Sequence, residues 1–212
     1  MDIQKEHWNN AYSKYVPEKP KYDLWLDKYS NILETSKNRP IIDLGCGGGN
    51  DSLYLSERGY RVISCDISES ALKMVKEFVP EVEAMVLNML EGLPFSDESA
   101  QIIIADLSLH YFYWKDTIRI VNEIKRVLKP SGYLICRVNS TKDVNYGAGN
   151  GNTIEENYYD VEGVMKRFFD REQIERLFDG WRFTYIKECQ MDRYKLPKIL
   201  WEVAVSKESE CR

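Results

Sequence analysis

Four glycines fall within five consecutive residues of this sequence, in the segment GCGGGN at positions 45–50. Glycine permits positive φ angles and lets backbone N–H groups approach a ligand with no Cβ in the way. The segment follows the apolar run IIDL and precedes residues with helical spacing, so it is expected to form a strand-to-helix turn. Because ligands of open α/β sheets bind at the carboxyl ends of the strands, we expect a ligand to lie against this turn.

Asp66 ends the next apolar run, YRVISCD, and is the second candidate for ligand chemistry. A carboxylate accepts two hydrogen bonds well, and the 2′ and 3′ hydroxyls of a ribose offer two donors. The competing interpretation is that Asp66 caps the helix that follows, but Ser68 already fits that position. We therefore expect Asp66 to bind a ribose.

Neither of the common phosphate-binding motifs is present at the glycine turn. A dinucleotide fingerprint requires G-x-G-x-x-G, and counting from Gly45 and Gly47 the third position is Asn50. A P-loop requires a lysine followed by Ser or Thr after its last glycine, and no lysine is near. The expected ligand is a nucleoside-like molecule without a pyrophosphate.

Apolar strands alternate with amphipathic helices around these residues. This alternation predicts a parallel sheet covered by helices on both faces. The last two strands leave no room for a helix between them, so they should pair as an antiparallel hairpin. The expected strands are residues 41–44, 60–66, 82–87, 100–107, 132–139, 181–188 and 198–207. One helix is expected to begin near residue 50, and three more are expected at residues 68–78, 115–129 and 170–179.

Composition limits the classes of function. The net charge of −5 and the pI near 5.3 argue against a broad phosphate-backbone footprint, and so against nucleic acid as a partner. The five cysteines, of which the last is Cys211, contain no C-x-x-C pair, which favours a reducing compartment and argues against a metal site. The first residues do not resemble a signal peptide, and no apolar run is long enough to span a bilayer. We expect a cytoplasmic protein, monomeric or homodimeric, that does not bind a membrane.

The motifs DLGCGGG, the CD that closes the second strand, LNMLEGLPF and ADLSLHYF resemble those of class I S-adenosylmethionine-dependent methyltransferases. The resemblance covers about residues 40–140 and 181–206, and within the family it is nearest to the tellurite-resistance and thiopurine-like small-molecule group (methyltransferase domain 11/25 type). It implies a Rossmann-like α/β fold, with a seven-stranded, mostly parallel sheet of order 3-2-1-4-5-7-6. It also implies S-adenosyl-L-methionine as the cofactor and S-adenosyl-L-homocysteine as the product.

The resemblance assigns cofactor contacts residue by residue. Asp43 would meet the methionine ammonium, the glycines would lie against the methionine and ribose, and Ile67 would pack on the adenine. Many relatives carry aspartate where this chain has Asn88, whose amide oxygen can still accept a bond from the adenine. The first helix of relatives folds over the cofactor. The cofactor-binding residues implied in this way are Asp43, Gly45, Cys46, Gly47, Asp66, Ile67, Asn88, Met89, Asp106, Leu107, Trp8 and Tyr12.

We expect a single domain with four parts. Residues 1–39 would form an N-terminal helical lid, 40–139 the cofactor-binding core, 140–169 a Gly/Asn-rich substrate-lid insertion, and 170–206 the C-terminal helix and strand pair. A connection as long as residues 140–165 is usually a functional lid or disordered.

The acceptor is less defined than the donor. Methyl transfer needs a general base only when the nucleophile carries a proton at neutral pH. His110, just after the fourth strand, could be that base or could simply pack between Tyr111 and Phe112. Relatives of the tellurite group carry a His-Arg pair where this chain reads Asp192-Arg193, which argues against tellurite as the substrate. The substrate-binding candidates are Tyr111, Arg137, Tyr146, Arg167 and Arg193.

Three functions remain open. The first is a methyltransferase with a small-molecule acceptor, favoured by the compact acidic chain and the lid. The second is a methyltransferase acting on RNA or protein, although the chain has no N-P-P-Y motif and no basic arm. The third is a non-catalytic cofactor-binding protein.

Overall fold

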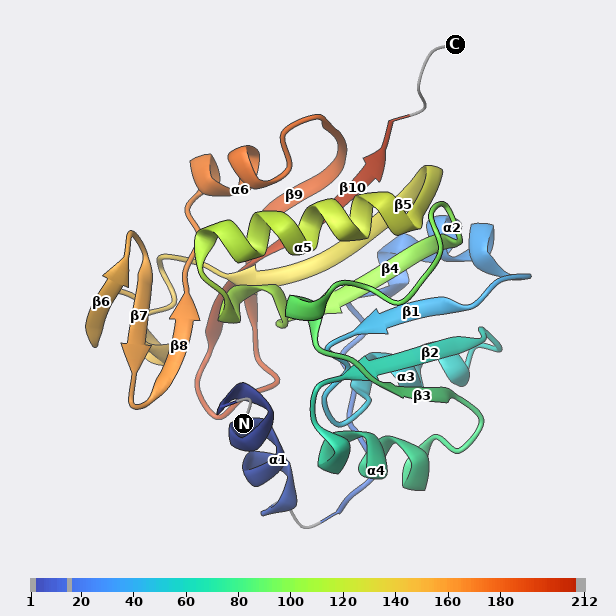
Figure 1. The fold of residues 1–212 in the computed structure, drawn as a ribbon, viewed down its shortest axis with the longest axis horizontal. Coiled ribbons are helices and arrows are strands. Elements are labelled where there is room, and N and C mark those ends of the chain that lie inside the picture. Colours follow the sequence, from blue (N-terminus) through green and yellow to red (C-terminus); the bar gives the residue numbers. More distant parts are fainter. Residues whose placement is uncertain (1–2, 15–16, 209–212) are drawn as a thin grey trace.

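The computed structural model describes residues 3–14 and 17–208, so Cys211 lies outside the described residues. A seven-stranded sheet forms its centre, with the strand order β3-β2-β1-β4-β5-β10-β9 (Figure 1). The strands are β1 (Ile41–Leu44), β2 (Val62–Asp66), β3 (Glu83–Val86), β4 (Ala100–Asp106), β5 (Leu128–Asn139), β9 (Trp181–Met191) and β10 (Lys198–Lys207).

The pairing of these strands confirms the predicted topology. β1 lies between β2 and β4, and the pairs from β3 to β5 are parallel. β10 is antiparallel to both β5 and β9. When the seven strands of this sheet are numbered alone, the order is the expected 3-2-1-4-5-7-6.

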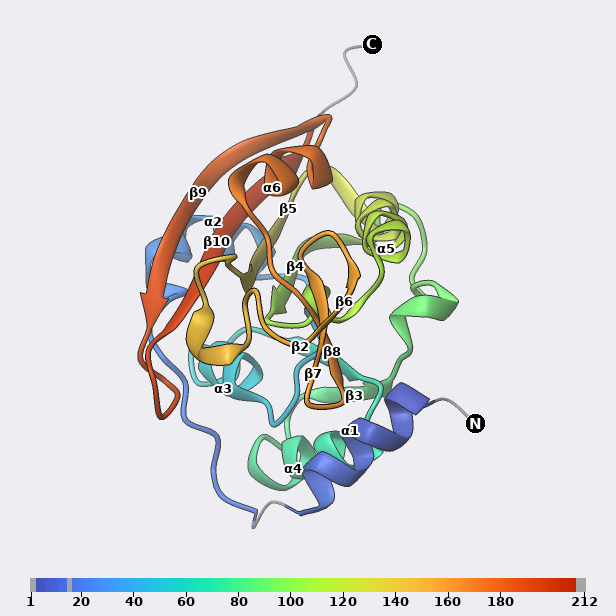
Figure 2. The same ribbon diagram turned by 90° about the vertical axis from the view of Figure 1, so that its left-hand side faces the viewer.

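Helices cover both faces of the sheet (Figure 2). α5 (Trp114–Val127) and α6 (Arg171–Leu177) pack on one face, where Ile120, Ile124 and Ile174 join the larger hydrophobic cluster. On the other face, α2 (Ser30–Leu33), α3 (Asn50–Ser56) and α4 (Glu69–Phe78) form a second cluster that includes Leu53 and Val75. β1 is buried along its whole length because the sheet is covered on both sides.

The insertion after β5 contains a sheet of its own. β6 (Asn152–Glu155), β7 (Tyr158–Val161) and β8 (Val164–Arg167) form a three-stranded antiparallel sheet beside the main body (Figure 1), preceded by the short η5 helix (Val144–Tyr146). Glu162 and Gly163, between β7 and β8, both have positive φ, as a tight hairpin turn requires. We expected a glycine-rich connection here, and its strands were not predicted.

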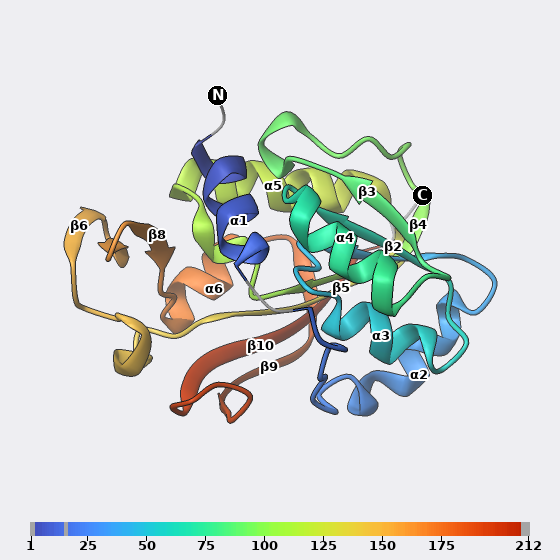
Figure 3. The same ribbon diagram turned by 90° about the horizontal axis from the view of Figure 1, so that it is seen from below.

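The N-terminal residues cross the carboxyl ends of the central strands. α1 (Ile3–Ser13) lies beside α4, and Asn9 accepts hydrogen bonds from the Ser68 hydroxyl and the Ser70 N–H (Figure 3). An extended strap, residues 17–26, then leads to the short helices η1 (Asp27–Tyr29), α2 and η2 (Glu34–Ser36). Within the described part of the chain, no helix has the length and apolar character needed to cross a membrane.

Candidate functional site

A cavity of about 740 Å³ opens at the carboxyl ends of β1 to β4. It contains every residue to which the sequence assigned a cofactor contact, although these residues come from five separate segments of the chain. The predicted cofactor residues that line it are Trp8, Tyr12, Asp43, Gly45, Cys46, Gly47, Asp66, Ile67, Asn88, Met89, Asp106 and Leu107.

The glycine turn forms one wall of the cavity at close range. Gly45 and Gly47 have φ angles of +77° and +53°. A Cβ on Gly45 would lie 2.4 Å from the Ser108 Cβ, and a Cβ on Gly47 would lie 2.4 Å from the Tyr12 hydroxyl oxygen. Both positions therefore favour glycine for the backbone conformation, and at Gly45 a Cβ would also collide with the Ser108 Cβ.

The Asp66 carboxylate is fixed by two backbone groups of the site. Its Oδ2 accepts a hydrogen bond from the Gly47 N–H at 2.9 Å, and its Oδ1 accepts one from the Ser68 N–H at 2.8 Å. Ser68 caps α4 by accepting from the Ala71 N–H, as predicted. Each Asp66 oxygen keeps further acceptor capacity on the cavity side, which suits a pair of hydroxyl donors.

Asp43 and Asp66 are two of the buried carboxyl groups of the site whose pKa values are raised. Burial, together with the charges of Asp106 and Asp66, raises the pKa of Asp43 to about 7, even though the Ser52 hydroxyl donates to it at 2.6 Å. Burial also raises the pKa of Asp66, against the opposite effect of its backbone hydrogen bonds. A cationic ligand would offset this cost, since an opposite charge favours the ionised carboxylate.

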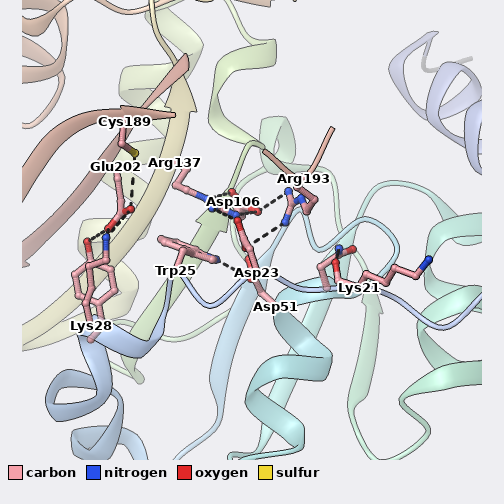
Figure 4. A network of polar contacts seen from close by, with 12 residues as sticks. Lys21, Asp23, Trp25, Lys28, Asp51, Asp106, Arg137, Cys189, Arg193 and Glu202 are labelled. Carbon is pink, nitrogen blue, oxygen red and sulfur yellow. Dashed lines mark hydrogen bonds and ion pairs between the residues drawn. The ribbon is translucent and has the colours of Figure 1, made fainter. Parts of the chain in front are cut away.

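Asp106, at the end of β4, is the centre of a charged network (Figure 4). Arg137 donates to its two oxygens at 2.7 Å each, and Arg193 donates to it at 3.0 Å. Burial opposes ionisation of Asp106, but the two guanidinium charges outweigh burial and lower its pKa. Arg137 also donates to Asp23 of the strap at 2.7 Å and lies over the Trp25 ring, so the network joins the strap to the sheet.

The backbone changes direction sharply after Asp106. Leu107 has a φ of +54°, which is strained for a residue with a branched side chain. Its N–H donates to the Arg137 carbonyl at 2.9 Å, and the next residue, Ser108, donates through its hydroxyl to the Leu44 carbonyl at 2.7 Å. The first bond ties the end of β4 to β5 and the second ties it to β1, beside the cavity.

The N-terminal segment forms the opposite wall of the cavity. Trp8 packs edge-on against Tyr111 with ring centroids 4.9 Å apart, and Tyr12 lies over the glycine turn. The strap contributes Glu18, Lys19, Pro20 and Lys21 to the lining, and the Lys21 carbonyl accepts a hydrogen bond from the Asn50 side chain. The site is therefore enclosed by residues far from the glycine turn in sequence.

The substrate candidates divide into two groups. Tyr111 and Arg193 line the cavity, but Arg137, Tyr146 and Arg167 are outside its lining. Arg137 is 2% exposed and paired with Asp106 and Asp23, which gives it a structural place between strap and sheet. The expectation that it contacts the substrate has no support in this arrangement.

Arg167 and Tyr146 likewise bind protein groups. The Arg167 guanidinium is 1% exposed, pairs with Glu155 and donates to the Glu156 carbonyl, so it anchors the insertion. The Tyr146 hydroxyl donates to the Leu196 carbonyl at 2.9 Å and fastens the β9–β10 turn. Both side chains hold the insertion and the β9–β10 turn in place from outside the cavity.

His110 is buried behind Tyr111, with ring centroids 4.3 Å apart, and is not among the lining residues. Burial, with the charges of Lys198 and Lys166, lowers its pKa, so the ring is neutral at pH 7. Its Nδ1 has no hydrogen-bond partner among the described residues. This position matches the wall interpretation more closely than direct contact with a substrate.

Several lining residues were missed by the sequence reasoning. Asp51, whose carboxylate accepts from the Trp25 indole N–H at 2.9 Å, follows the glycine turn directly and could have been found from its place at the start of α3. Tyr194 and the strap residues 18–21 carry no local signal, because only the fold brings them to the cavity. In the described part of the chain, no three His, Cys, Asp or Glu side chains are grouped to hold a metal ion.

Comparisons with known proteins agree with this geometry. Residues 42–136 match the family described as "Methyltransferase domain". The chain is 32% identical over 136 residues to the putative methyltransferase YqeM of Bacillus subtilis, covering 62% of this chain and 54% of that protein. It is also 32% identical over 142 residues to the human mitochondrial arginine-hydroxylase NDUFAF5, covering 63% of this chain and 39% of that protein. This chain thus spans about half the length, or less, of the curated relatives it matches.

Solved structures share the fold. A methyltransferase from Methanosarcina mazei superposes with a TM-score of 0.70 at 24% identity, over 81% of this chain and 93% of that one. The 1,6-didemethyltoxoflavin-N1-methyltransferase of Burkholderia thailandensis, solved with its substrate and S-adenosylhomocysteine, gives a TM-score of 0.64 at 16% identity, over 97% and 84%. The Burkholderia protein holds S-adenosylhomocysteine, and the glycine cradle and the Asp66 carboxylate of this chain fit an adenosyl group.

Proposed function

We propose that this chain, a class I S-adenosylmethionine-dependent methyltransferase by its domain match and fold, transfers the methyl group of that cofactor to a small-molecule acceptor. The observation that carries the proposal is a single cavity in which the glycine turn and the Asp66 carboxylate face the rings of Tyr12 and Tyr111. The first pair suits the adenosyl half of the donor, and the aromatic pair suits a cationic sulfonium and a flat acceptor.

The bound cofactor supplies a methyl group already activated by its positive sulfur. The residues of the chain have to bind, orient and exclude water, and orientation alone can lower the barrier by roughly 7–11 kcal/mol. Asp66 and the Gly45–Gly47 backbone bind the donor, Asp43 compensates positive charge, and Trp8 and Tyr12 cover the site from solvent. With these residues assigned to the donor, the acceptor would bind at the side of the cavity lined by Tyr111 and Tyr194.

A small acceptor is supported by the way in which the cavity is enclosed. α1, the strap and the β9–β10 turn all contribute lining residues, so an acceptor has to reach the donor between these segments. A protein or RNA segment would need them to move apart, whereas a small molecule would not. The acidic net charge of −5 also disfavours RNA.

The test is a turnover screen that measures release of S-adenosylhomocysteine with thiols, phenols, amines, carboxylates, chalcogen oxyanions and RNA as acceptors. One relative is named as a hydroxylase, so product release, rather than cofactor binding, is the measurement that decides the reaction. Turnover with a small molecule supports the proposal. Turnover only with RNA or a protein would show instead a methyltransferase that acts on macromolecules. Tight cofactor binding without any turnover would show a non-catalytic cofactor-binding protein.

The position of His110 can be tested in the same assay. If it acts as a general base, His110→Ala should lower turnover of an oxygen or nitrogen acceptor at least ~100-fold. A smaller decrease would assign the ring to the wall, in support of which it packs against Tyr111 with ring centroids 4.3 Å apart.

A further inference from the structure

Arg193 lies at the turn between β9 and β10, lines the cavity and has one buried donor group without a hydrogen-bond partner among the described residues. Its Nη2 donates to Asp106 at 3.0 Å, but its Nη1 is buried and has no hydrogen-bond partner among the described residues. The nearest carboxylate oxygen recorded for Nη1 is Oδ1 of Asp23, at 3.7 Å, which is an ion pair without a hydrogen bond. A buried guanidinium N–H without a partner is costly, so a ligand group that accepts from it would be bound strongly.

The two acids near Arg193 are already used by Arg137. That residue donates to both oxygens of Asp106 and to both oxygens of Asp23, at 2.7–3.3 Å. Arg193 therefore makes fewer contacts with the same carboxylates. Its guanidinium is held in place by the hydrogen bond from Nη2 to Asp106. The arrangement leaves Nη1 available to a third carboxylate.

The strand order shows which end of the cofactor would meet Arg193. Asp66 ends β2, and Asn88 follows β3, so the ribose and adenine lie over that side of the sheet. β1 and then β4 continue the sheet in the opposite direction. The methionine end of the donor is thus directed toward the end of β4, where Asp106 holds Arg193.

The methionine end carries a carboxylate, and few cations line the cavity to meet it. Among the lining residues that the structure describes, the cations are Lys19, Lys21 and Arg193. The side chains of Lys19 and Lys21 are 62% and 83% exposed and are paired with Glu57 and Glu18, whereas that of Arg193 is 18% exposed. Because charge interactions are stronger where water is excluded, Arg193 is the best placed of the three.

We propose that Arg193 binds the α-carboxylate of the cofactor through its Nη1 group, an inference that rests on the proposed function. Arg193 would then be a donor-binding residue and not the acceptor ligand expected from the sequence. The turn that carries it is fixed to the insertion by the Tyr146–Leu196 hydrogen bonds, so donor binding would also order the acceptor side.

The experiment compares two ligands that differ only in this carboxylate, S-adenosylmethionine and decarboxylated S-adenosylmethionine. Their dissociation constants are measured by titration calorimetry for the wild type and for Arg193→Met. We expect the wild type to prefer the carboxylate-bearing ligand by about 10- to 100-fold, the range for a charged hydrogen bond. In Arg193→Met this preference should fall to within about twofold, with the affinity for the decarboxylated ligand unchanged.

Two further variants serve as controls. Lys21→Met removes an exposed cation of the same cavity and should keep the wild-type preference. Arg193→Lys keeps the charge and should show an intermediate preference, and it replaces Arg193→Met if that variant does not fold. Three outcomes would each overturn the inference. Arg193→Met could lose affinity equally for both ligands, Arg193→Met could keep the wild-type preference, or the preference could be lost only in Lys21→Met. Failure of the wild type to bind either ligand would instead overturn the proposed function.

Discussion

Replacement of Asp66 tests the donor site most directly. Its carboxylate oxygens already accept from the Gly47 and Ser68 N–H groups at 2.9 and 2.8 Å, so at most one further strong bond per oxygen is left for a ribose. A hydrogen bond to a charged group contributes about 1.5–3 kcal/mol. Losing even one such bond predicts that Asp66→Ala raises the dissociation constant of the cofactor at least about tenfold.

The same substitution should change stability much less than affinity. Leaving the two backbone N–H donors without Asp66 lowers stability by about 1 kcal/mol for each. Removing a buried carboxylate with a raised pKa relieves an unfavourable burial and offsets part of this loss. The expected change in the free energy of unfolding is therefore below about 2 kcal/mol without ligand. Asp66→Asn keeps the shape and one acceptor, and it should give an intermediate affinity.

The assay is calorimetric titration of S-adenosylhomocysteine, which has the same ribose as the donor, accompanied by urea denaturation of each variant. A folded Asp66→Ala protein with the wild-type dissociation constant would refute the assignment of the ribose to Asp66. It would also show that the carboxylate serves only to hold Gly47 and Ser68 in place.

Three further predictions concern the walls of the cavity. The pKa of Asp43 is raised to about 7, and a cationic donor favours the ionised form of this carboxyl group. The donor should therefore bind about eightfold more weakly at pH 6 than at pH 7.5. Calorimetry should find that Asp43→Asn lacks this pH dependence. In the ligand-free protein the same shift should lower stability as pH rises from about 4 to about 7, since the native state keeps a proton that the unfolded chain releases. The new Cβ of Gly45→Ala would lie 2.4 Å from the Ser108 Cβ, whereas that of Gly59→Ala would meet nothing within 4 Å. Thermal unfolding should therefore show only the backbone cost of about 1–2 kcal/mol for Gly59→Ala and a clearly larger loss of stability for Gly45→Ala. Similar losses of stability in the two variants would contradict the steric argument. Arg137→Met leaves the buried Asp106 carboxylate paired with Arg193 alone among the described residues and should cost about 3 kcal/mol in urea denaturation, and a cost below about 1 kcal/mol would contradict its structural place.

The donor half of the site could be predicted from sequence because its determinants are local. The apolar runs of β1, β2 and β4 fix where the strands end, and the residues that follow each strand must then meet at one edge of the sheet. Ser68 at the start of α4 and the glycines after β1 fix the turns between them. Twelve predicted cofactor residues consequently line one cavity.

The acceptor half could not be predicted because its determinants are distant in sequence. Arg137 is held by Asp23, 114 positions away, and this partner decides that its guanidinium is structural. Arg167 donates to the Phe112 carbonyl, 55 positions away. The strands of the insertion are only four residues long, and β6 is largely exposed, so their apolar pattern is weak.

Asp106 explains how these two halves are joined. It ends a core strand within the matched methyltransferase segment, residues 42–136, but its partners Arg137 and Arg193 lie beyond that segment, and Arg137 carries the connection on to Asp23 of the strap. The strap and the β9–β10 turn are thereby positioned relative to a single carboxylate at the floor of the donor site. Under the proposed function these segments would also form the route by which an acceptor enters, so the position of the acceptor relative to the donor would depend on this network. A family pattern confined to the core can therefore point to the donor, while under the proposed function the acceptor would be selected by residues that the pattern does not contain.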